Sequence, residues 1–282
     1  MRGQRHTVTG LALGLALLSG VSLGAVQLPL APVSGAGETV TPAFEGWYES
    51  PDGALSLSFG YFNRNGEEIL EIPIGPDNFI APGDPDQGQP THFQPRRHWG
   101  VFVVRVPVDY AGEKVVWTLK IRGETFSIPA NLKAEWKIDA LEGEVGSGNT
   151  PPVLRFEVAG PEGSGPGGVT GVPLKASVGH PLKLTVFARD DGVRSGSVRR
   201  SGEEAEPVTL TWFKHRGPGD VTFGESEIEV EAAGGEGTTT AMFSEPGDYV
   251  LRVRANDASG VSGAGHAQCC WTNGFVKVTV IH

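Results

Sequence analysis

Short segments of alternating apolar and polar residues, separated by glycine and proline, most constrain how this chain can fold. Its 282 residues include 41 glycines and 21 prolines. Residues 249–255 begin with an aromatic side chain, follow a Pro-Gly turn and keep apolar side chains at every second position. A period of two is typical of a half-buried strand, and no segment has a convincing helical period. The sequence therefore predicts an all-β protein.

Composition divides the chain into five segments. Basic residues, then an apolar run at 11–18, then small residues predict a secretory signal peptide at the N-terminus. Long alternating regions are separated by a segment rich in Gly, Pro and polar residues, which is typical of a linker. We therefore expect a signal peptide at 1–25, a flexible tail at 26–42, an N-terminal β-domain at 43–141, a linker at 142–152 and a β-sandwich at 153–282. The fold class predicted is two β-sandwich-like domains in tandem.

Charge and hydropathy limit where in the cell this protein is expected to be and which classes of partner it is expected to bind. The apolar run at 11–18 is too short to span a bilayer, so we expect no transmembrane anchor and an exported, periplasmic or extracellular protein. The net charge of -10 argues against binding to nucleic acid. A cell-envelope or extracellular protein, or a glycan, is the expected partner.

The N-terminal domain has a hairpin signal and a long irregular stretch. Alternation at 55–61 is followed by Asn65-Gly66 and by further alternation at 70–74, which predicts a β-hairpin. The valine-rich run at 101–106 predicts a strand that is covered on both faces. Residues 75–95 contain five prolines and predict a loop that supplies a contact surface.

The second domain resembles polycystic-kidney-disease (PKD) and related immunoglobulin-like modules. Four motifs in the same order carry this resemblance: Asn-Thr-Pro-Pro at 149–152, Ala-Arg-Asp-Asp-Gly at 188–192, Leu-Thr-Trp-Phe-Lys at 210–214 with the turn and strand that follow, and the segment 246–260. The resemblance implies a Greek-key sandwich with a binding or spacing role and no catalysis of its own. A charged insertion at 193–206 departs from the pattern.

The N-terminal domain resembles uncharacterised exported bacterial β-proteins. Its segment Phe-Glu-Gly-Trp-Tyr at 44–48 is similar to the opening strand of lipocalin-like cyclases and isomerases. That similarity implies a weaker alternative function, an enzyme with an apolar cup.

Cys269 and Cys270 are adjacent and are the only cysteines of the chain. In an exported protein they are expected to be oxidised, which favours a vicinal disulfide over free thiols or intermolecular bridges. The pair acts either as a redox or ligand-contacting ring or as a rigid turn before the last strand, and the structural role is favoured. His266 lies close in sequence, but a closed disulfide would exclude a soft metal ion.

Asp190, Asp191 and Asp257 lie at strand ends that are expected to meet at one pole of the second sandwich. Such oxygen clusters bind calcium in other proteins, and calcium is the one candidate cofactor. The alternative, which we favour, is that these carboxylates accept hydrogen bonds from turn amides.

Aromatic and basic residues of the N-terminal domain are candidate ligand or partner contacts. The sequence contains no nucleophile elbow, zinc-protease helix, phosphate loop or dinucleotide motif, so no catalytic residue is assigned. We expect a non-catalytic binding or assembly protein, with a carbohydrate-binding protein of polysaccharide turnover as the alternative. The candidate contact residues are Trp47, Tyr48, Arg96, Arg97, His98 and Trp99.

Overall fold

The computed structural model describes residues 33–50, 52–110, 114–143, 148–193, 205–257, 259 and 269–282. The expected signal peptide at 1–25 and His266 lie outside these residues. Residues Val33–His282 form one compact unit, which contains two β-sandwich domains in tandem. No helix in the described ranges is long and apolar enough to cross a membrane.

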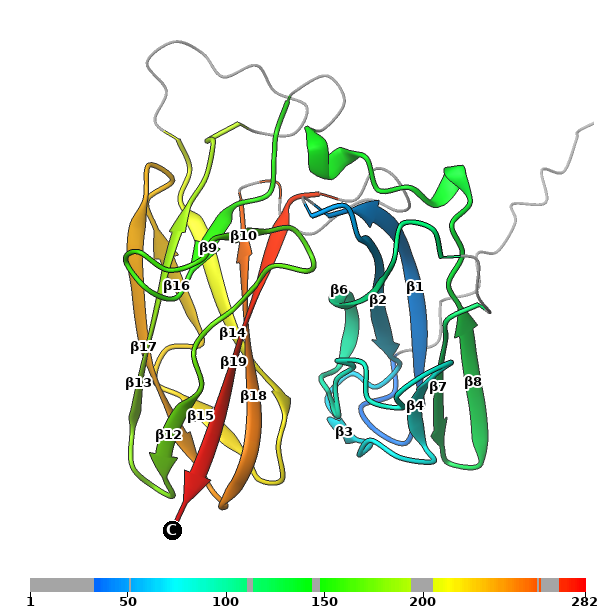
Figure 1. The fold of residues 1–282 in the computed structure, drawn as a ribbon. Helices are drawn as coiled ribbons and strands as arrows, with labels where there is room; N and C mark the ends of the chain where they lie inside the picture. The colour runs from blue at the N-terminus through cyan, green and yellow to red at the C-terminus, as the bar shows by residue number, and fades with distance from the viewer. Residues whose placement is uncertain are drawn as a thin grey trace, which may run out of the picture. The chain divides into compact units, whose positions relative to one another are not determined.

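The N-terminal domain consists of two three-stranded antiparallel sheets and a two-stranded ribbon (Figure 1). The sheet orders are β1-β2-β6 and β4-β7-β8, and β3 pairs with β5. Two single-turn 3-10 helices, η1 (Ala134–Trp136) and η2 (Ala140–Glu142), follow the last strand. The strands are β1 (Val40–Glu49), β2 (Leu55–Asn63), β3 (Leu70–Glu71), β4 (Asn78–Ala81), β5 (His92–Phe93), β6 (Arg96–Val106), β7 (Val116–Ile121) and β8 (Glu124–Pro129).

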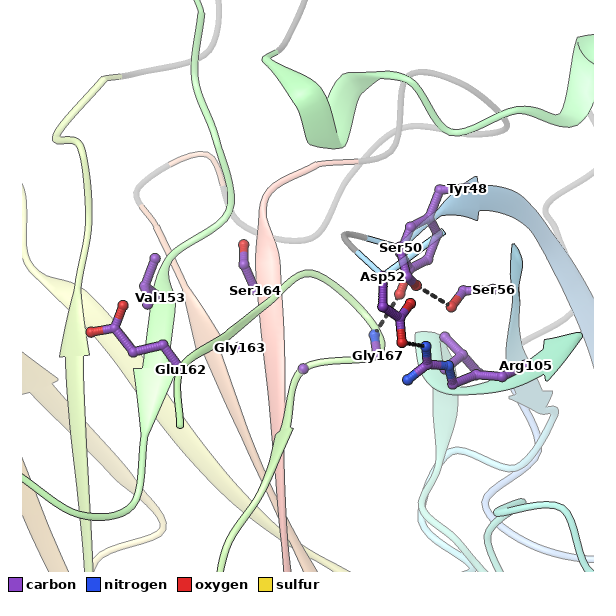
Figure 2. Close-up of a pocket in the computed structure, with 12 residues that line it drawn as sticks. Tyr48, Ser50, Asp52, Ser56, Arg105, Val153, Glu162, Gly163, Ser164 and Gly167 are labelled. Atoms are coloured by element: carbon purple, nitrogen blue, oxygen red, sulfur yellow. Dashed lines mark hydrogen bonds and ion pairs between the residues drawn. The ribbon is translucent and has the colours of Figure 1, made fainter. Parts of the chain in front are cut away.

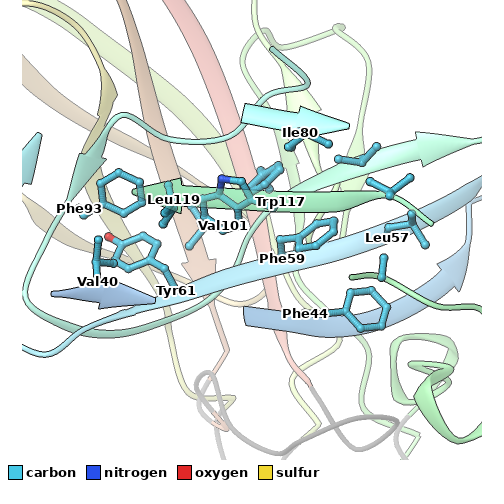
Figure 3. Packing of buried hydrophobic residues seen from close by; sticks show 14 of the residues in the cluster. Val40, Phe44, Leu57, Phe59, Tyr61, Ile80, Phe93, Val101, Trp117 and Leu119 are labelled. Carbon is cyan, nitrogen blue, oxygen red and sulfur yellow. The ribbon is translucent and has the colours of Figure 1, made fainter. Parts of the chain in front are cut away.

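Aromatic side chains fill the core of this domain (Figure 3). Trp117 packs edge-on against Phe59 and Phe102, and its indole N–H donates to Oδ1 of Asn78 at 3.0 Å. The two sheets have three strands each, whereas a lipocalin cup is a closed barrel of eight. The lipocalin-like expectation from residues 44–48 is therefore wrong at the level of the fold.

The stretch at 75–95 is ordered structure and not a free loop. It contains β4, which pairs with β7, and β5, which pairs with β3. Ile80 and Phe93 are in the core, and Nδ2 of Asn78 donates to the carbonyl oxygens of Ile72 and Pro90. Buried residues therefore anchor this stretch on both sides of residues 81–86, which are exposed.

The hairpin predicted around Asn65-Gly66 does not form. The strand before it, β2, pairs with β1 and β6, and the strand after it, β3, pairs with β5. The side chain of Asn65 is buried and binds the backbone N–H and C=O of Glu38. The Asn-Gly signal therefore marks a turn that holds the N-terminal segment against the domain.

The second domain is a sandwich of a five-stranded sheet and a six-stranded sheet, ordered β10-β9-β13-β17-β15 and β11-β19-β18-β14-β16. Strand β12 adds to the second sheet by pairing in parallel with β19. In Figure 1, β13 and β17 lie in one layer and β14, β18 and β19 in the other. The strands are β9 (Val153–Arg155), β10 (Gly163–Ser164), β11 (Val169–Thr170), β12 (Leu174–Ser177), β13 (Leu182–Arg189), β14 (Val208–Arg216), β15 (Val221–Phe223), β16 (Glu227–Val230), β17 (Gly235–Phe243), β18 (Gly247–Asn256) and β19 (Trp271–Ile281).

Strand pairing and two side chains define this domain as immunoglobulin-like. The order β9-β13-β17-β15 opposite β14-β18-β19 corresponds to the A-B-E-D and C-F-G sheets of that fold. Trp212 on β14 occupies the position of the buried tryptophan on strand C. The hydroxyl of Tyr249, near the start of β18, donates to the carbonyl oxygen of Glu245 at 2.8 Å, which is a tyrosine corner. The prediction of an all-β chain with an Ig-like second sandwich is confirmed.

Candidate functional site at the domain junction

Strand β18 presents its two faces to different surroundings. Leu251 and Val253 point into the core of the second sandwich. Arg252 and Arg254 lie on the other face, because side chains alternate along a strand. There they come close enough to Tyr61 of the N-terminal domain for their charges to influence its hydroxyl. The outer face of the C-F-G sheet is therefore covered by the first domain.

A bulge in β14 concentrates polar side chains at this junction. The pairing of β14 with β18 shifts register between Lys214 and Arg216. Nζ of Lys214 binds Oε1 of Glu71 at 2.9 Å, and Nδ1 of His92 lies 2.6 Å from the same oxygen. Although burial opposes it, the hydrogen bonds from His92 and Lys214 lower the pKa of Glu71. Glu71 is thus held as a carboxylate that links the two sandwiches.

Arg216 makes the second charged link. Its Nη1 and Nη2 donate to Oδ2 and Oδ1 of Asp86 at 2.8 and 2.7 Å, and its Nε donates to the carbonyl oxygen of Gln89 at 2.7 Å. The hydrogen bonds from Arg216 are the main cause of the lowered pKa of Asp86. A planar guanidinium that binds both carboxylate oxygens fixes orientation as well as distance.

His215 is buried between these two ion pairs. Its Nε2 donates to the carbonyl oxygen of Gly88 at 2.9 Å, and its own carbonyl oxygen accepts from the N–H of Thr91 at 3.1 Å. Burial lowers the pKa of His215 to about 3. The imidazole is therefore neutral at physiological pH and acts as a fixed hydrogen-bond donor.

Strand β19 docks on a single glycine of the first domain. The indole N–H of Trp271 and Nδ2 of Asn273 both donate to the carbonyl oxygen of Gly100, at 3.3 and 2.7 Å. Gly100 has a φ of +42°, and a Cβ at this position would overlap the indole of Trp271. The close approach of the two domains here requires glycine.

The predicted contact residues at 96–99 are divided between different roles. Nη2 of Arg97 binds both carboxylate oxygens of Glu45, at 2.6 and 2.7 Å, and its guanidinium stacks 4.0 Å from the ring of Trp99. Glu45 is 3 % exposed, and burial raises its pKa to about 7 despite the charge of Arg97. Arg96 is exposed above the ring of Phe62, 5.7 Å from its centroid. This segment forms an internal ion pair and not one continuous contact surface.

His98 and the aromatic residues of β1 are also separated. The ring of His98 stacks on Tyr61 at 4.9 Å and meets Phe213 of the second domain edge-on at 6.0 Å. The indole N–H of Trp47 donates to the carbonyl oxygen of Lys133 at 2.8 Å. Two of the predicted contact residues, His98 and Tyr48, contact the second domain through their side chains.

Tyr48 lines a pocket of about 480 Å³ between strands of both domains (Figure 2). Its hydroxyl accepts from the backbone N–H of Gly167 at 2.8 Å. The hydroxyls of Ser50 and Ser56 bind each other at 2.8 Å, and Asp52 pairs with Arg105. The described lining contains neither a histidine nor a cysteine, and its acidic residues are Asp52 and Glu162.

None of the six tryptophans forms an exposed platform. Trp117, Trp212 and Trp271 are buried. Trp47, Trp99 and Trp136 are partly buried, and the exposed large hydrophobic side chains among the described residues are all aliphatic or methionine. The described surface therefore lacks the stacked aromatic face that a glycan-binding role would use.

The three acidic residues of the second domain lie together near its linker. Each accepts from the backbone N–H two residues further along, at 2.8, 2.8 and 2.9 Å for Asp190, Asp191 and Asp257. Burial, followed by the charges of Asp191 and Asp257, raises the pKa of Asp190 to about 6. Nowhere in the described ranges do three or more His, Cys, Asp or Glu side chains form a group able to hold a metal ion. Calcium binding here stays a prediction.

Cys269 and Cys270 are joined by a disulfide at the start of β19. They are 3 % and 0 % exposed and pack with Ala140, and their sulfur atoms lie 4.0 and 3.9 Å from the carbonyl oxygen of Asn149. The pair thus lies where the linker segment meets the strand that docks on Gly100.

We expect intact-mass analysis of the native protein after alkylation to show no modified cysteine and no covalent dimer. Both sulfur atoms are bonded to each other and buried, so neither is available to the reagent. Alkylation after denaturation without a reductant is the stringent control, and labelling of two thiols in that sample would contradict the disulfide.

Comparisons with known proteins give no family. No family model matches the chain, and no curated protein matches its sequence. Solved structures of low similarity include the D00-D0 domain of intimin, at 12 % identity and a TM-score of 0.27, covering 86 % of this chain and 100 % of that one. Domains 4 and 5 of the S-layer protein SbsC align at 13 % identity and a TM-score of 0.24, covering 64 % and 71 %. Fibronectin(III)-like modules of CbhA from Clostridium thermocellum align at 13 % identity and a TM-score of 0.20, covering 86 % and 95 %. TM-scores this low do not establish a shared fold, so the class of this chain rests on its own strand order.

Sequence reasoning missed the residues that build the junction. Arg252 and Arg254 alternate with core residues on β18, a pattern that indicates the polar face of a strand. That signal places them away from the core, but it contains no information about what covers them. Glu71 and Asp86 carried no signal, because their partners are more than a hundred positions away in the chain.

Proposed function

We propose that this chain is an exported, non-catalytic binding or assembly protein. Its second sandwich, a PKD-like module, acts as a rigid support that presents the N-terminal domain to a cell-envelope or extracellular protein. The observation that supports this most directly is the docked junction, where two ion pairs, His215 and the Gly100 contact join the domains. A spacer connected only by a flexible linker needs none of these contacts.

The chemistry of the described residues supports a binding role over catalysis. In the pocket of Figure 2 the hydroxyls of Ser50 and Ser56 bind each other, and in the acidic cluster turn amides donate to the carboxylates. The alternative of glycan recognition has no exposed aromatic face in the described part of the chain. A protein partner is therefore the better-supported choice.

The test is a crosslinked pull-down from the cell envelope with the tagged full chain. Wild-type protein is compared with Gly100→Ala, whose new methyl group would collide with Trp271 and separate the domains. Gly179→Ala is the matched control, because Gly179 also has a positive φ, of +71°, but a Cβ there meets nothing within 4 Å. Limited proteolysis reports whether each variant is docked.

We expect the wild type and Gly179→Ala to recover the same dominant protein, and Gly100→Ala to lose it. Recovery of that protein by a folded but undocked Gly100→Ala would contradict the role of rigid presentation. Recovery of glycan alone, or of nothing above background, would contradict the binding and assembly function itself.

A further inference from the structure

Two arginines of β18 stack on one phenylalanine at the junction. The Cζ atoms of Arg252 and Arg254 lie 4.5 and 5.3 Å from the ring centroid of Phe213. Arg252 is 2 % exposed, and Arg254 is mostly buried. Among the described residues no carboxylate lies within ion-pair distance of either one, although the charge of Glu227 on β16 is near enough to act on the pKa of Arg254. By contrast, Lys214 and Arg216, the two cationic residues of β14 at this junction, each form an ion pair with an acidic residue of the first domain.

The hydrogen-bonding capacity of these guanidinium groups is almost unused. Each arginine carries five N–H donors. Within the described structure the one bond that they make runs from Nη1 of Arg252 to Oδ1 of Asn273, at 3.0 Å. Nε of Arg254 is buried and meets no acceptor there. Buried donors and charges without partners cost free energy, so an acceptor that satisfied them would stabilise the docked chain.

The first domain closes the same space with two polar rings. Nε2 of His98 lies 3.2 Å from the carbonyl oxygen of Pro95, which places the proton on this nitrogen, and Nδ1 is buried without a partner. The hydroxyl oxygen of Tyr61 accepts from the N–H of Gln94 at 3.1 Å, which leaves its own proton available. The rings of His98 and Tyr61 are stacked. The charges of Arg252 and Arg254 act to lower the pKa of both side chains.

We propose that Arg252 and Arg254, together with the hydroxyl of Tyr61, form a binding site for an oxyanion at the domain junction. A carboxylate or a phosphate has the planar or tetrahedral oxygen arrangement that a guanidinium fork binds, and it would neutralise the excess positive charge. His98 borders this site. The anion is a free small molecule or the acidic group of a partner that reaches the junction at the partly exposed Arg254.

The experiment titrates the full chain with inorganic phosphate, and separately with acetate, at constant ionic strength maintained with sodium chloride. Thermal unfolding and isothermal calorimetry are the two readouts. A ligand that binds only the folded chain raises its unfolding temperature in a saturable manner. We expect a saturable rise with one or both oxyanions, and dissociation constants about tenfold weaker or worse in Arg254→Gln, which removes the fork.

Arg64→Gln is the matched control. Arg64 also lies over a phenylalanine ring, 5.8 Å from that of Phe62, but it is exposed, so this variant removes the same charge far from the proposed site. Arg254→Lys, which keeps the charge without the fork, serves if Arg254→Gln fails to fold, and it too is expected to bind more weakly than wild type. If only phosphate raises the unfolding temperature, the natural ligand is inferred to carry a phosphate group. If acetate raises it, the ligand is inferred to carry a carboxylate.

Two results would overturn the proposal. The first is no response beyond that of chloride in the wild type, which would mean that water alone satisfies these donors. The second is an equal response in wild type, Arg64→Gln and Arg254→Gln, which would show that the anion binds elsewhere. Neither result affects the outcome of the pull-down. The oxyanion site can therefore be disproved without disproving the proposed binding function, and the reverse also holds.

Discussion

Replacement of Arg97 by methionine is expected to lower the free energy of unfolding by about 3–5 kcal/mol. The carboxylate of Glu45 is buried and bound by Arg97 at 2.6 and 2.7 Å, so the variant would leave a buried charge without its guanidinium. The hydrogen bond from the backbone of Gly100, which also favours the charged form of Glu45, would remain. Chemical denaturation at pH 9, where Glu45 is ionised in the wild type, measures the loss.

The control for this experiment is Arg96→Met, one residue away. Arg96 is exposed over Phe62, so its replacement is expected to change stability by less than about 0.5 kcal/mol. The double variant Glu45→Leu/Arg97→Met is expected to recover much of the loss, because it removes the buried charge as well as its partner. A loss in Arg97→Met no larger than that in Arg96→Met would contradict a buried ion pair.

The cost of Arg97→Met is also expected to depend on pH. Burial holds the pKa of Glu45 at about 7 even with Arg97 present, and removal of the guanidinium raises it further. As the pH falls from 9 towards 7 the variant can therefore protonate Glu45 and avoid the buried charge. We expect the difference between wild type and variant to shrink as the pH falls from 9 to 7, and to change little below pH 7, where Glu45 is protonated in both folded proteins.

Acidification from pH 7 to pH 5 is expected to destabilise the docked protein by about 2 kcal/mol for each of His98 and His215. Burial, and secondarily the charges of Arg252 and other nearby arginines, lower both pKa values from 6.5 to about 3. Between these values the unfolded chain binds a proton that the folded chain does not. The free energy of unfolding therefore falls as the pH drops through 6.5, by about 1.4 kcal/mol per pH unit and group.

Two carboxyl groups act in the opposite direction. The folded-state pKa values of Glu45 and Asp190 are raised to about 7 and about 6, so their protonation favours the folded state as the pH falls. The total pH dependence is thus a sum of opposing contributions. A single replacement of one histidine isolates its contribution.

His215→Gln is the informative variant, because glutamine keeps a donor for the carbonyl oxygen of Gly88 but cannot take up a proton. Denaturation at pH 7 and pH 5 is compared for wild type, His215→Gln and the exposed control His180→Gln. We expect the stability difference between the two pH values to change by about 2 kcal/mol in His215→Gln only. The same difference in all three proteins would show that His215 is not buried in the docked state.

The strands of the second sandwich were largely predictable from the sequence. The expected strand at 249–255 lies within β18, because its alternation is strong and a Pro-Gly turn precedes it. Strands β10, β11 and β15 were not predicted, since two or three residues at a sheet edge carry too short a pattern.

Prediction was poorer in the first domain. The hairpin at Asn65-Gly66 and the loop at 75–95 both followed from local turn signals. Burial of Ile80 and Phe93 converts the proline-rich stretch into part of the core, and a local signal contains no information about such a distant packing partner. The same limit applies to 96–99, where neighbours in sequence point to different partners.

The sequence by itself determined the all-β class, the Ig-like second sandwich and which side chains of β18 avoid its core, since each depends on patterns within a few residues. Tertiary structure alone decided that Arg252, Arg254 and His215 are covered, that Arg97 pairs with Glu45, and that Lys214 and Arg216 reach Glu71 and Asp86. The physical reason is that periodicity fixes the face of a strand on which a side chain lies. What covers that face depends on contacts between segments far apart in the chain.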